Sequence, residues 1–286
     1  MKSLLICPAE REHVAALAED VPLATLPLCG RSLAEYWLVH LVGAGAREVL
    51  VLSSDRTSHV HTHLGDGARW GLKVTVQNEV AERTAAEGRT KFKAADNSNW
   101  LAGPNDVIVM DRLPDQPEFP LFTSYAGWFA ALVDHLPRAA TSDRIGMRVL
   151  KLGVWAGLRT QIAPTAELHA PCWIGDNVRV GDGAVIGPNV IIESNSFVEP
   201  RATIRDSYVG PGTFVGAFTD IEQSIALGNT LVSWKYDSVL KVPDEFLLSS
   251  LDPARLAAGG LVPGHSLSSR QSQPAWSWKF NAKTEL

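Results

Sequence analysis

Aliphatic residues recur at every sixth position through the second half of the chain. The anchors of this pattern are Ile162, Leu168, Ile174, Val180, Ile186, Ile192, Val198 and Ile204, followed after one shorter step by Val209, Val215, Ile221 and Leu227. An α-helix repeats every 3.6 residues and a strand every 2, so neither element gives this period. The period is typical of hexapeptide repeats that coil into a left-handed parallel β-helix, which we predict over residues 155–240.

The positions between the anchors agree with this prediction. The residue four places after an anchor is usually small, as the crowded interior of a coil requires: Ala166, Cys172, Val178, Ala184, Val190, Ser196 and Ala202. Turn-forming pairs separate the anchors at residues 164–165, 176–177, 182–183, 188–189 and 200–201. Asn and Gly, which tolerate left-handed backbone, occur in several of these pairs. We expect them to form the corners of the coils.

Residues 1–150 show a different pattern, in which short apolar runs alternate with a helical one. The expected strands are residues 4–7, 48–52, 73–77 and 106–110, and the expected helices are residues 33–44 and 121–136. Strands that alternate with helices predict a parallel sheet of the βαβ type. Ligands of such sheets bind beyond the carboxyl ends of the strands. The loops after Cys7 and Met110 are therefore the first places to search for a site.

Length, charge and cysteine content narrow the class of protein. A chain of 286 residues has room for two domains, and its net charge of -5 argues against a nucleic-acid-binding role. No apolar run reaches the roughly 20 residues that span a bilayer, and the apolar run after Lys2 is too short for a signal peptide. The three cysteines are widely spaced, which indicates neither a disulfide framework nor a zinc site. We expect a cytoplasmic protein without a membrane partner.

Several segments carry a resemblance to a known family. They are residues 19–22, 26–28, 30–31, 35–38 and 64–71, the last reading Leu-Gly-Asp-Gly-Ala-Arg-Trp-Gly. They resemble the sugar-1-phosphate nucleotidyltransferases, most closely the mannose-1-phosphate guanylyltransferase and glucose-1-phosphate nucleotidylyltransferase branch. The resemblance covers roughly residues 1–111 and 155–235. It implies a shortened Rossmann-like α/β domain followed by the β-helix. It also implies a reaction of a nucleoside triphosphate with a sugar-1-phosphate to give an NDP-sugar.

The resemblance places the family's phosphate-binding loop, G-x-G-T-R, after the first strand. Aligned without gaps from Pro22, the two glycines fall on Ala9 and Arg11, and the catalytic arginine falls on His13. The Lys-Pro pair that follows in the family falls on residues 23–24, Leu-Ala. Backbone N–H groups and cationic side chains of such a loop stabilise the charge of a triphosphate. Their loss predicts impaired catalysis.

Two other family positions concern the base and the metal. The base-contacting segment resembles residues 83–86, where Thr84 and Ala85 are kept but Arg83 replaces the leading glycine. Asp111, after the fourth strand, matches the metal-binding aspartate of the family. Carboxylates and phosphate oxygens hold Mg²⁺ in such sites, so Mg²⁺ is the expected cofactor of an active protein.

These features favour a nucleotidyltransferase-family protein that is catalytically impaired and acts in binding, regulation or assembly. One alternative is an active NDP-sugar pyrophosphorylase with an altered phosphate site. Another is an acyltransferase built on the hexapeptide repeats, with His169 as its general base. The expected ligand is a nucleotide or a sugar phosphate, and the expected partner is a second copy of the chain, with a trimer or dimer formed through the β-helix.

Some polar and aromatic residues have no place in this scheme. His59, His61 and His63 alternate as in a strand or loop and are candidate metal ligands, while Arg11, Arg31 and Arg69 are candidates for a new anion site. The predicted C-terminal extension, residues 241–286, has a helical pattern over residues 244–256. It also contains Trp276, Trp278 and Phe280, which we expect to dock on a partner or on the body of the protein.

Overall fold

The computed structural model describes residues 2–95, 106–140, 144 and 146–251. Its N-terminal part, residues 2–140, is built on a parallel sheet with the strand order β5-β4-β1-β6. The parallel α/β arrangement predicted for this part is therefore confirmed. Its elements are β1 (Lys2–Ile6), η1 (Glu12–Ala18), η2 (Leu23–Thr25), β2 (Pro27–Leu28), β3 (Arg31–Ser32), α1 (Leu33–Gly43), β4 (Glu48–Ser53), α2 (Thr57–Leu64), η3 (Ala68–Trp70), β5 (Lys73–Asn78), α3 (Ala85–Ala95), β6 (Val107–Val109) and α4 (Tyr125–Ala139).

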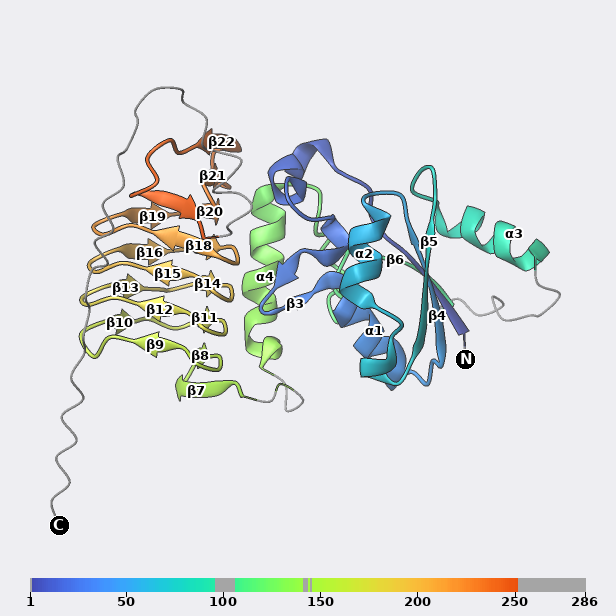
Figure 1. Cartoon of the computed structure of the whole chain (residues 1–286), viewed down its shortest axis with the longest axis horizontal. Helices are drawn as coiled ribbons and strands as arrows, with labels where there is room; N and C mark the ends of the chain where they lie inside the picture. The colour runs from blue at the N-terminus through green and yellow to red at the C-terminus, as the bar shows by residue number, and fades with distance from the viewer. Residues whose placement is uncertain (1, 96–105, 141–143, 145, 252–286) are drawn as a thin grey trace, which may run out of the picture.

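The sheet separates two cores because successive side chains of a strand point to opposite faces. Leu4 and Ile6 of β1 pack with Leu52 and Val107 in a small core on the side of α3. Leu5, between them, belongs to a larger core that includes α1 and α4. Figure 1 shows α3 on the outer side of the sheet and α4 on the other side, next to the C-terminal part.

The C-terminal part, residues 146–251, is a stack of short strands that are parallel from β8 to β20 and fit the predicted β-helix, while β7, β21, β22 and β23 pair antiparallel at its ends and edge. Three sheets run along it, with the orders β10-β13-β16-β19, β23-β18-β15-β12-β9 and β22-β21-β20-β17-β14-β11-β8-β7. The strands are β7 (Arg148–Lys151), β8 (Val154–Ala156), β9 (Gln161–Ile162), β10 (Glu167–Leu168), β11 (Cys172–Ile174), β12 (Arg179–Val180), β13 (Val185–Ile186), β14 (Val190–Ile192), β15 (Phe197–Val198), β16 (Thr203–Arg205), β17 (Ser207–Val209), β18 (Thr213–Val215), β19 (Asp220–Glu222), β20 (Ser224–Leu227), β21 (Thr230–Ser233), β22 (Ser238–Lys241) and β23 (Leu248–Ser250).

The six-residue anchors are the inward side chains of the coils. Ile174 pairs with Ala156 on one side and Ile192 on the other, so equivalent residues of successive coils stack. Six of the seven small inward residues are buried as predicted, Cys172 and Ala184 among them, and Ala166 is partly buried. The stack begins one strand earlier than the anchors suggest, because Ala156 at the end of β8 already occupies an inward position.

The predicted corners use left-handed backbone. The φ angles of Asn177, Gly183, Asn189 and Arg201 are 55°, 65°, 52° and 61°. Asn177 also donates a hydrogen bond of 3.0 Å from its side-chain amide to that of Asn195, one coil further on. The corners are therefore held both by local conformation and by contacts between successive coils. The left-handed sense of the coils stays a prediction.

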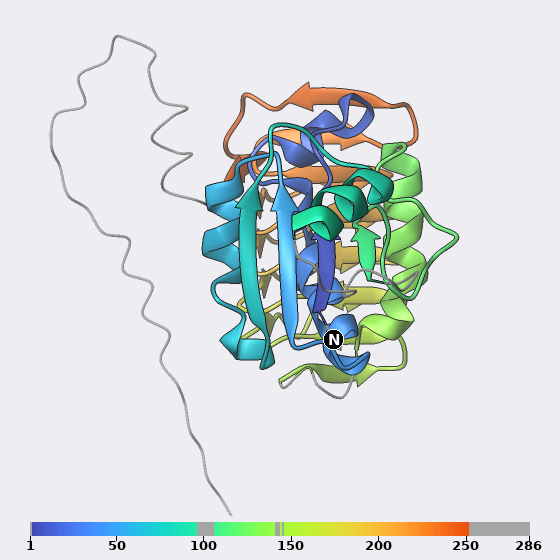
Figure 2. The ribbon, with the colours of Figure 1, turned by 90° about the vertical axis from the view of Figure 1, so that its right-hand side faces the viewer.

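The two parts meet along the outer face of one β-helix sheet. Its outward residues, one from each successive coil, are Trp155, Trp173, Ile191, Tyr208 and Ile225. Four of them belong to the larger core of the N-terminal part, and Trp155 packs against it. Trp128 of α4 meets Tyr208 edge-on at 4.8 Å, and Phe129 stacks on Trp234 at 5.0 Å. Figure 2 shows the parallel sheet in front of the coils, with α4 beside it.

Two predictions of secondary structure are wrong. His59, His61 and His63 lie on α2 and not on a strand, because Val60 and Leu64 form a buried helical stripe beneath them. The helix predicted from residue 244 is absent over the described residues 244–251, where a turn leads into β23. Leu248 of β23 is buried and pairs antiparallel with Val215 of β18. Trp276, Trp278 and Phe280 lie outside the described residues.

Candidate functional site

The loop after β1 is closed by a carboxylate from a neighbouring loop. Glu82 accepts a hydrogen bond of 2.8 Å from the backbone N–H of Ala9 and another of 2.8 Å from the guanidinium of Arg11. The closest approach of the Arg11 and Glu82 charges is 2.6 Å. The hydrogen bond with Glu82 is the main cause that raises the pKa of Arg11 above its ordinary value. The backbone N–H of Ala9 and the guanidinium of Arg11 are therefore both engaged by Glu82.

A second carboxylate nearby, that of Glu79, engages two further basic side chains. Glu79 is 6 % exposed and accepts hydrogen bonds from Arg83 and Lys91. Burial works against its ionisation, but these two cations outweigh burial and lower its pKa. Thr84 is the residue before α3, and it exchanges hydrogen bonds with Glu87. Thr84 and Ala85 therefore form a capped helix start.

Asp111, the candidate metal ligand, is paired with its neighbour. Its two oxygens lie 2.8 Å and 3.1 Å from the Arg112 guanidinium, which also donates to the carbonyl of Pro117. Mg²⁺ prefers several oxygen ligands arranged around it. The described residues contain no group of three or more His, Cys, Asp or Glu side chains that could hold a metal ion. The arrangement around Asp111 therefore favours an ion pair between side chains.

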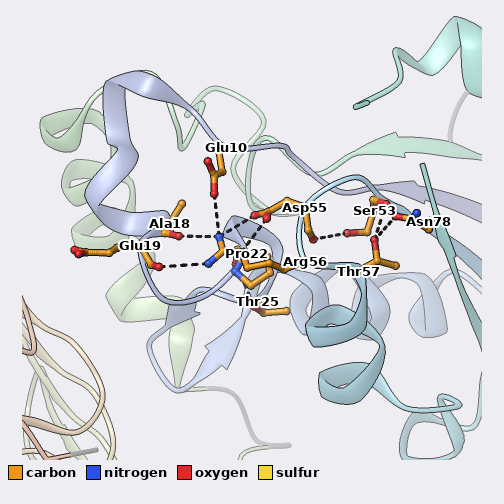
Figure 3. Close-up of polar contacts among 10 residues, drawn as sticks. All are labelled: Glu10, Ala18, Glu19, Pro22, Thr25, Ser53, Asp55, Arg56, Thr57 and Asn78. Atoms are coloured by element: carbon orange, nitrogen blue, oxygen red, sulfur yellow. Dashed lines mark hydrogen bonds and ion pairs between the residues drawn. The ribbon is translucent and has the colours of Figure 1, made fainter. Parts of the chain in front are cut away.

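Arg56 ties the segment after β1 to the end of β4 (Figure 3). Its guanidinium donates to the carbonyl of Ala18 at 2.7 Å and forms a bidentate pair with Asp55. A second carboxylate, that of Glu10, lies 3.5 Å away. Arg56 adopts a left-handed φ of 39°, which turns the chain into α2. The 3-10 segment that includes His13 is therefore fixed against the sheet, with His13 exposed on it.

A cleft of about 710 Å³ lies between the two parts of the protein. Apolar side chains such as Leu26 and Leu251 form much of its wall, and His59, His63 and Asn195 add polar groups. Burial is the main cause that lowers the pKa of His59, and the neighbouring His63 lowers it further. An apolar cleft with a few converging polar groups is a common form of small-molecule site.

His63 belongs to a polar network at the start of α1. It lies 2.9 Å from the hydroxyl of Ser32, and Arg69 lies 3.1 Å from the carboxylate of Glu35. Burial would raise the pKa of Glu35, but hydrogen bonds from His63 and Ser32 and the Arg69 charge lower it to about 2. Arg11 and Arg69 engage different carboxylates, so the structure does not bring them together into one anion site.

A buried glutamate links the parts at their junction. Glu193, directly after the anchor Ile192, is 1 % exposed and accepts a hydrogen bond of 2.9 Å from the backbone N–H of Gly30. Burial raises the pKa of its carboxyl from the ordinary value of 4.5 to about 7, although the Gly30 N–H and the Arg144 charge oppose this change. A carboxyl of this kind changes its charge near neutral pH.

The sequence analysis missed both Glu82 and Glu193, although a signal for the second one exists. The equivalent positions in neighbouring coils, directly after the inward anchor, are Gly157, Gly175 and Gly210. A glutamate at a position that is glycine in the neighbouring coils indicates a side chain that points out of the coil, here toward the N-terminal part. No comparable pattern surrounds Glu82.

His169, the candidate base of the β-helix, lies at the end of β10. Its side chain is 52 % exposed, and its Nε2 is 3.6 Å from the carboxylate of Glu167.

No helix of the described residues is long and apolar enough to cross a bilayer. Among families of known proteins, residues 171–206 match the model of the bacterial transferase hexapeptide (six repeats). This match covers the central coils, agrees with the six-residue period and is compatible with a transferase.

Proposed function

We propose that this protein is a nucleotidyltransferase-like protein that has lost nucleotidyl transfer and acts through binding, regulation or assembly. The observation that carries the proposal is the position of Glu82. Its carboxylate engages the backbone N–H of Ala9 and the guanidinium of Arg11. These two residues stand where the family's phosphate-binding loop has its two glycines. An anion bound by this loop would have to displace a carboxylate that the chain itself supplies.

The surrounding charges support the same conclusion. A triphosphate needs cations that are available to it, and Mg²⁺ needs carboxylates that are available to it. Here Arg83 and Lys91 are paired with Glu79, and Asp111 is paired with Arg112. Each of these pairs would have to break before a nucleotide and its metal could bind. The N-terminal part then serves as a frame on which other surfaces are presented.

The test is a pyrophosphate-release assay on the full chain. GTP, UTP, CTP, ATP and dTTP are each mixed with Mg²⁺ and a panel of hexose-1-phosphates, beside an active pyrophosphorylase as positive control. We expect no pyrophosphate from this protein, and no shift of its melting temperature with any of the nucleotides at millimolar concentration. Turnover with any pair of substrates would overturn the proposal and favour an active pyrophosphorylase with an altered phosphate site.

Assembly is part of the proposed role. One sheet of the β-helix is covered by the N-terminal part, so self-association would use the two other sheets or the ends of the stack. We infer a homo-oligomer, with a trimer favoured over a dimer. Light scattering coupled to size-exclusion chromatography measures the mass directly. A monomer at micromolar concentration would contradict this inference.

A second candidate function is acyl transfer, which the match of residues 171–206 to a bacterial transferase repeat favours. His169 and Glu167 would then supply a base and its partner at an exposed coil edge. The test is consumption of acyl-CoA in the presence of amino-sugar acceptors, with His169→Ala as the matched variant. An unchanged acyl-CoA pool counts against this function.

A further inference from the structure

A small pocket lies at the junction of the two parts, away from the loop after β1. Its volume is about 200 Å³. Residues of three segments form it, namely Gly30 and Arg31 from the β2–β3 turn, Arg144 and Met147 before β7, and Trp173, Gly175, Asp176 and Ser194 from two successive coils. A water molecule in liquid takes about 30 Å³, so this space fits a group of several non-hydrogen atoms.

Trp173 lines this pocket and has a buried indole donor that is not used. Trp173 is 1 % exposed, and its Nε1 has no hydrogen-bond partner within the described part of the chain. The adjacent ring edge faces Gly30, since Cζ2 lies 3.6 Å from the place that a Gly30 Cβ would take. A buried N–H without an acceptor costs roughly 1–3 kcal/mol. A ligand that supplies an acceptor here would remove this cost.

Arg144 brings a positive charge to the same wall. Its guanidinium carbon lies 4.9 Å above the Trp173 ring, and its terminal nitrogens donate to the carbonyl of Cys29 and the hydroxyl of Tyr36. Both acceptors are neutral, and its buried Nε has no partner among the described residues. Arg31 is a second basic residue in the lining. Two cations and an unused indole donor favour an anionic ligand.

Two acidic groups lie near the pocket, Asp176 in its lining and Glu193 next to Gly30. Asp176 uses one carboxylate oxygen to accept the N–H of Leu158 at 2.7 Å, and it lies at the exposed side of the pocket. Glu193 contacts Gly30 from behind the pocket wall. Because burial already raises its pKa to about 7, a bound anion would favour its protonated, neutral form.

We propose that this pocket binds a phosphoryl group, either as free phosphate or as the phosphate of a small phosphorylated metabolite. Arg144 and Arg31 would supply the charge, and the Trp173 N–H and the Ser194 hydroxyl would add donors. The site uses none of the residues of the loop after β1. It therefore goes beyond the proposed function, and either conclusion can fail without the other.

The test is isothermal titration calorimetry on the full chain in phosphate-free buffer. Inorganic phosphate, a hexose-1-phosphate and the unphosphorylated hexose are titrated separately. We expect the two phosphate compounds to bind and the hexose not to bind. Tighter binding of the hexose-1-phosphate would show that the pocket takes a phosphorylated metabolite, whereas equal binding would show that it takes free phosphate. Failure of both phosphate compounds to bind at millimolar concentration would overturn the proposal.

Variants locate the binding. Arg144→Ala should raise the Kd by about tenfold or more, because a charge-assisted contact is lost. If this variant fails to fold, Arg144→Lys replaces it and should also raise the Kd, because lysine keeps the charge but loses the paired donors of the guanidinium. Trp173→Phe removes one neutral donor and should raise the Kd by about three- to tenfold. Arg179→Ala, on the exposed face of β12, is the matched control and should leave the Kd unchanged. Equal weakening in Arg179→Ala, or none in both Arg144 variants, would place the anion elsewhere and refute the site.

Discussion

The buried carboxyl of Glu193 should make the stability of the protein depend on pH in a way that one substitution removes. Glu193 lies at the junction of the two parts, where it contacts the backbone N–H of Gly30. Glu193→Gln keeps a carbonyl oxygen for this N–H but removes the charge. Comparing the two proteins at each pH isolates the contribution of this group from those of all other acidic residues.

The sign follows from the protons bound in each state. The unfolded chain has the ordinary pKa of 4.5, whereas burial raises the pKa of the folded state to about 7. Between these values the folded state holds more protons, so its stability falls as pH rises and levels off above pH 7. At about 1.4 kcal/mol per pKa unit, this group alone destabilises the folded wild type by roughly 2.5 kcal/mol between pH 5 and pH 8.

The glutamine has a cost of its own. Its amide nitrogen needs an acceptor in the buried site, which lowers stability by about 1–2 kcal/mol at every pH. We therefore expect Glu193→Gln to be less stable than wild type by about 1–2 kcal/mol at pH 5. At pH 8 it should be more stable by about 1 kcal/mol, since it avoids the buried charge.

The assay is guanidinium unfolding followed by circular dichroism at pH 5, 6, 7 and 8 at constant ionic strength. The measured quantity is the difference in free energy of unfolding between variant and wild type. Glu199→Gln, at the corresponding position after the next anchor but only partly buried, should show a difference that changes by less than about 0.5 kcal/mol over this range. A difference for Glu193→Gln that stays flat, or a variant that becomes less stable relative to wild type as pH rises, would refute the reasoning.

Three further predictions test the junction, the corners and the closed loop. Trp128→Ala should lower the free energy of unfolding by about 3–5 kcal/mol, since a fully buried ring packed on Tyr208 is lost, and a loss below 1 kcal/mol in chemical denaturation would contradict that packing. Gly175→Ala should destabilise by about 1–3 kcal/mol, because its Cβ would lie 2.7 Å from the backbone N of Ser194, whereas Gly43→Ala, with open space around it, should not destabilise in the same melting experiment. Glu82→Ala should lower the free energy of unfolding by about 1–2 kcal/mol relative to the exposed control Glu118→Ala. The Glu82→Ala protein should still release no pyrophosphate, because Asp111 stays paired with Arg112. Turnover by this variant would show that the Glu82 carboxylate only inhibits an intact site.

The six-residue period predicts the coils well because the residues near each anchor are enough to indicate that its side chain points into the coil. A pattern of aliphatic anchors, small inward residues and turn-forming corners requires no knowledge of distant contacts. The predicted range, residues 155–240, already includes Ala156, but the anchors begin only at Ile162 because the pattern of larger aliphatic residues does not include an alanine. The α2 helix is missed for a related reason, since alternating histidines conceal the apolar pair Val60 and Leu64.

The candidate site is less predictable because it depends on contacts between distant segments. Glu82 is separated from Ala9 by 73 residues, and Glu193 is separated from Gly30 by 163 residues. The sequence indicates that the loop after β1 lacks the glycines and the catalytic arginine of the family, but it does not indicate which side chain fills the space. Hydrogen bonds of this kind depend on how the sheet and coils pack, which periodicity does not determine.

The packing of α4 has a consequence for how the chain folds during synthesis. The apolar face of α4 is covered by residues such as Tyr208 and Trp234, and the Tyr208 hydroxyl bonds the carbonyl of Pro27 across 181 positions of sequence. At about 5–20 residues per second, a ribosome needs roughly 5–20 s after making α4 to supply these partners. During this interval Trp128 and Phe129 have no coil to cover them. The nascent N-terminal part would then expose apolar surface of the kind that holding chaperones bind, and slow synthesis of the coils would prolong this exposure.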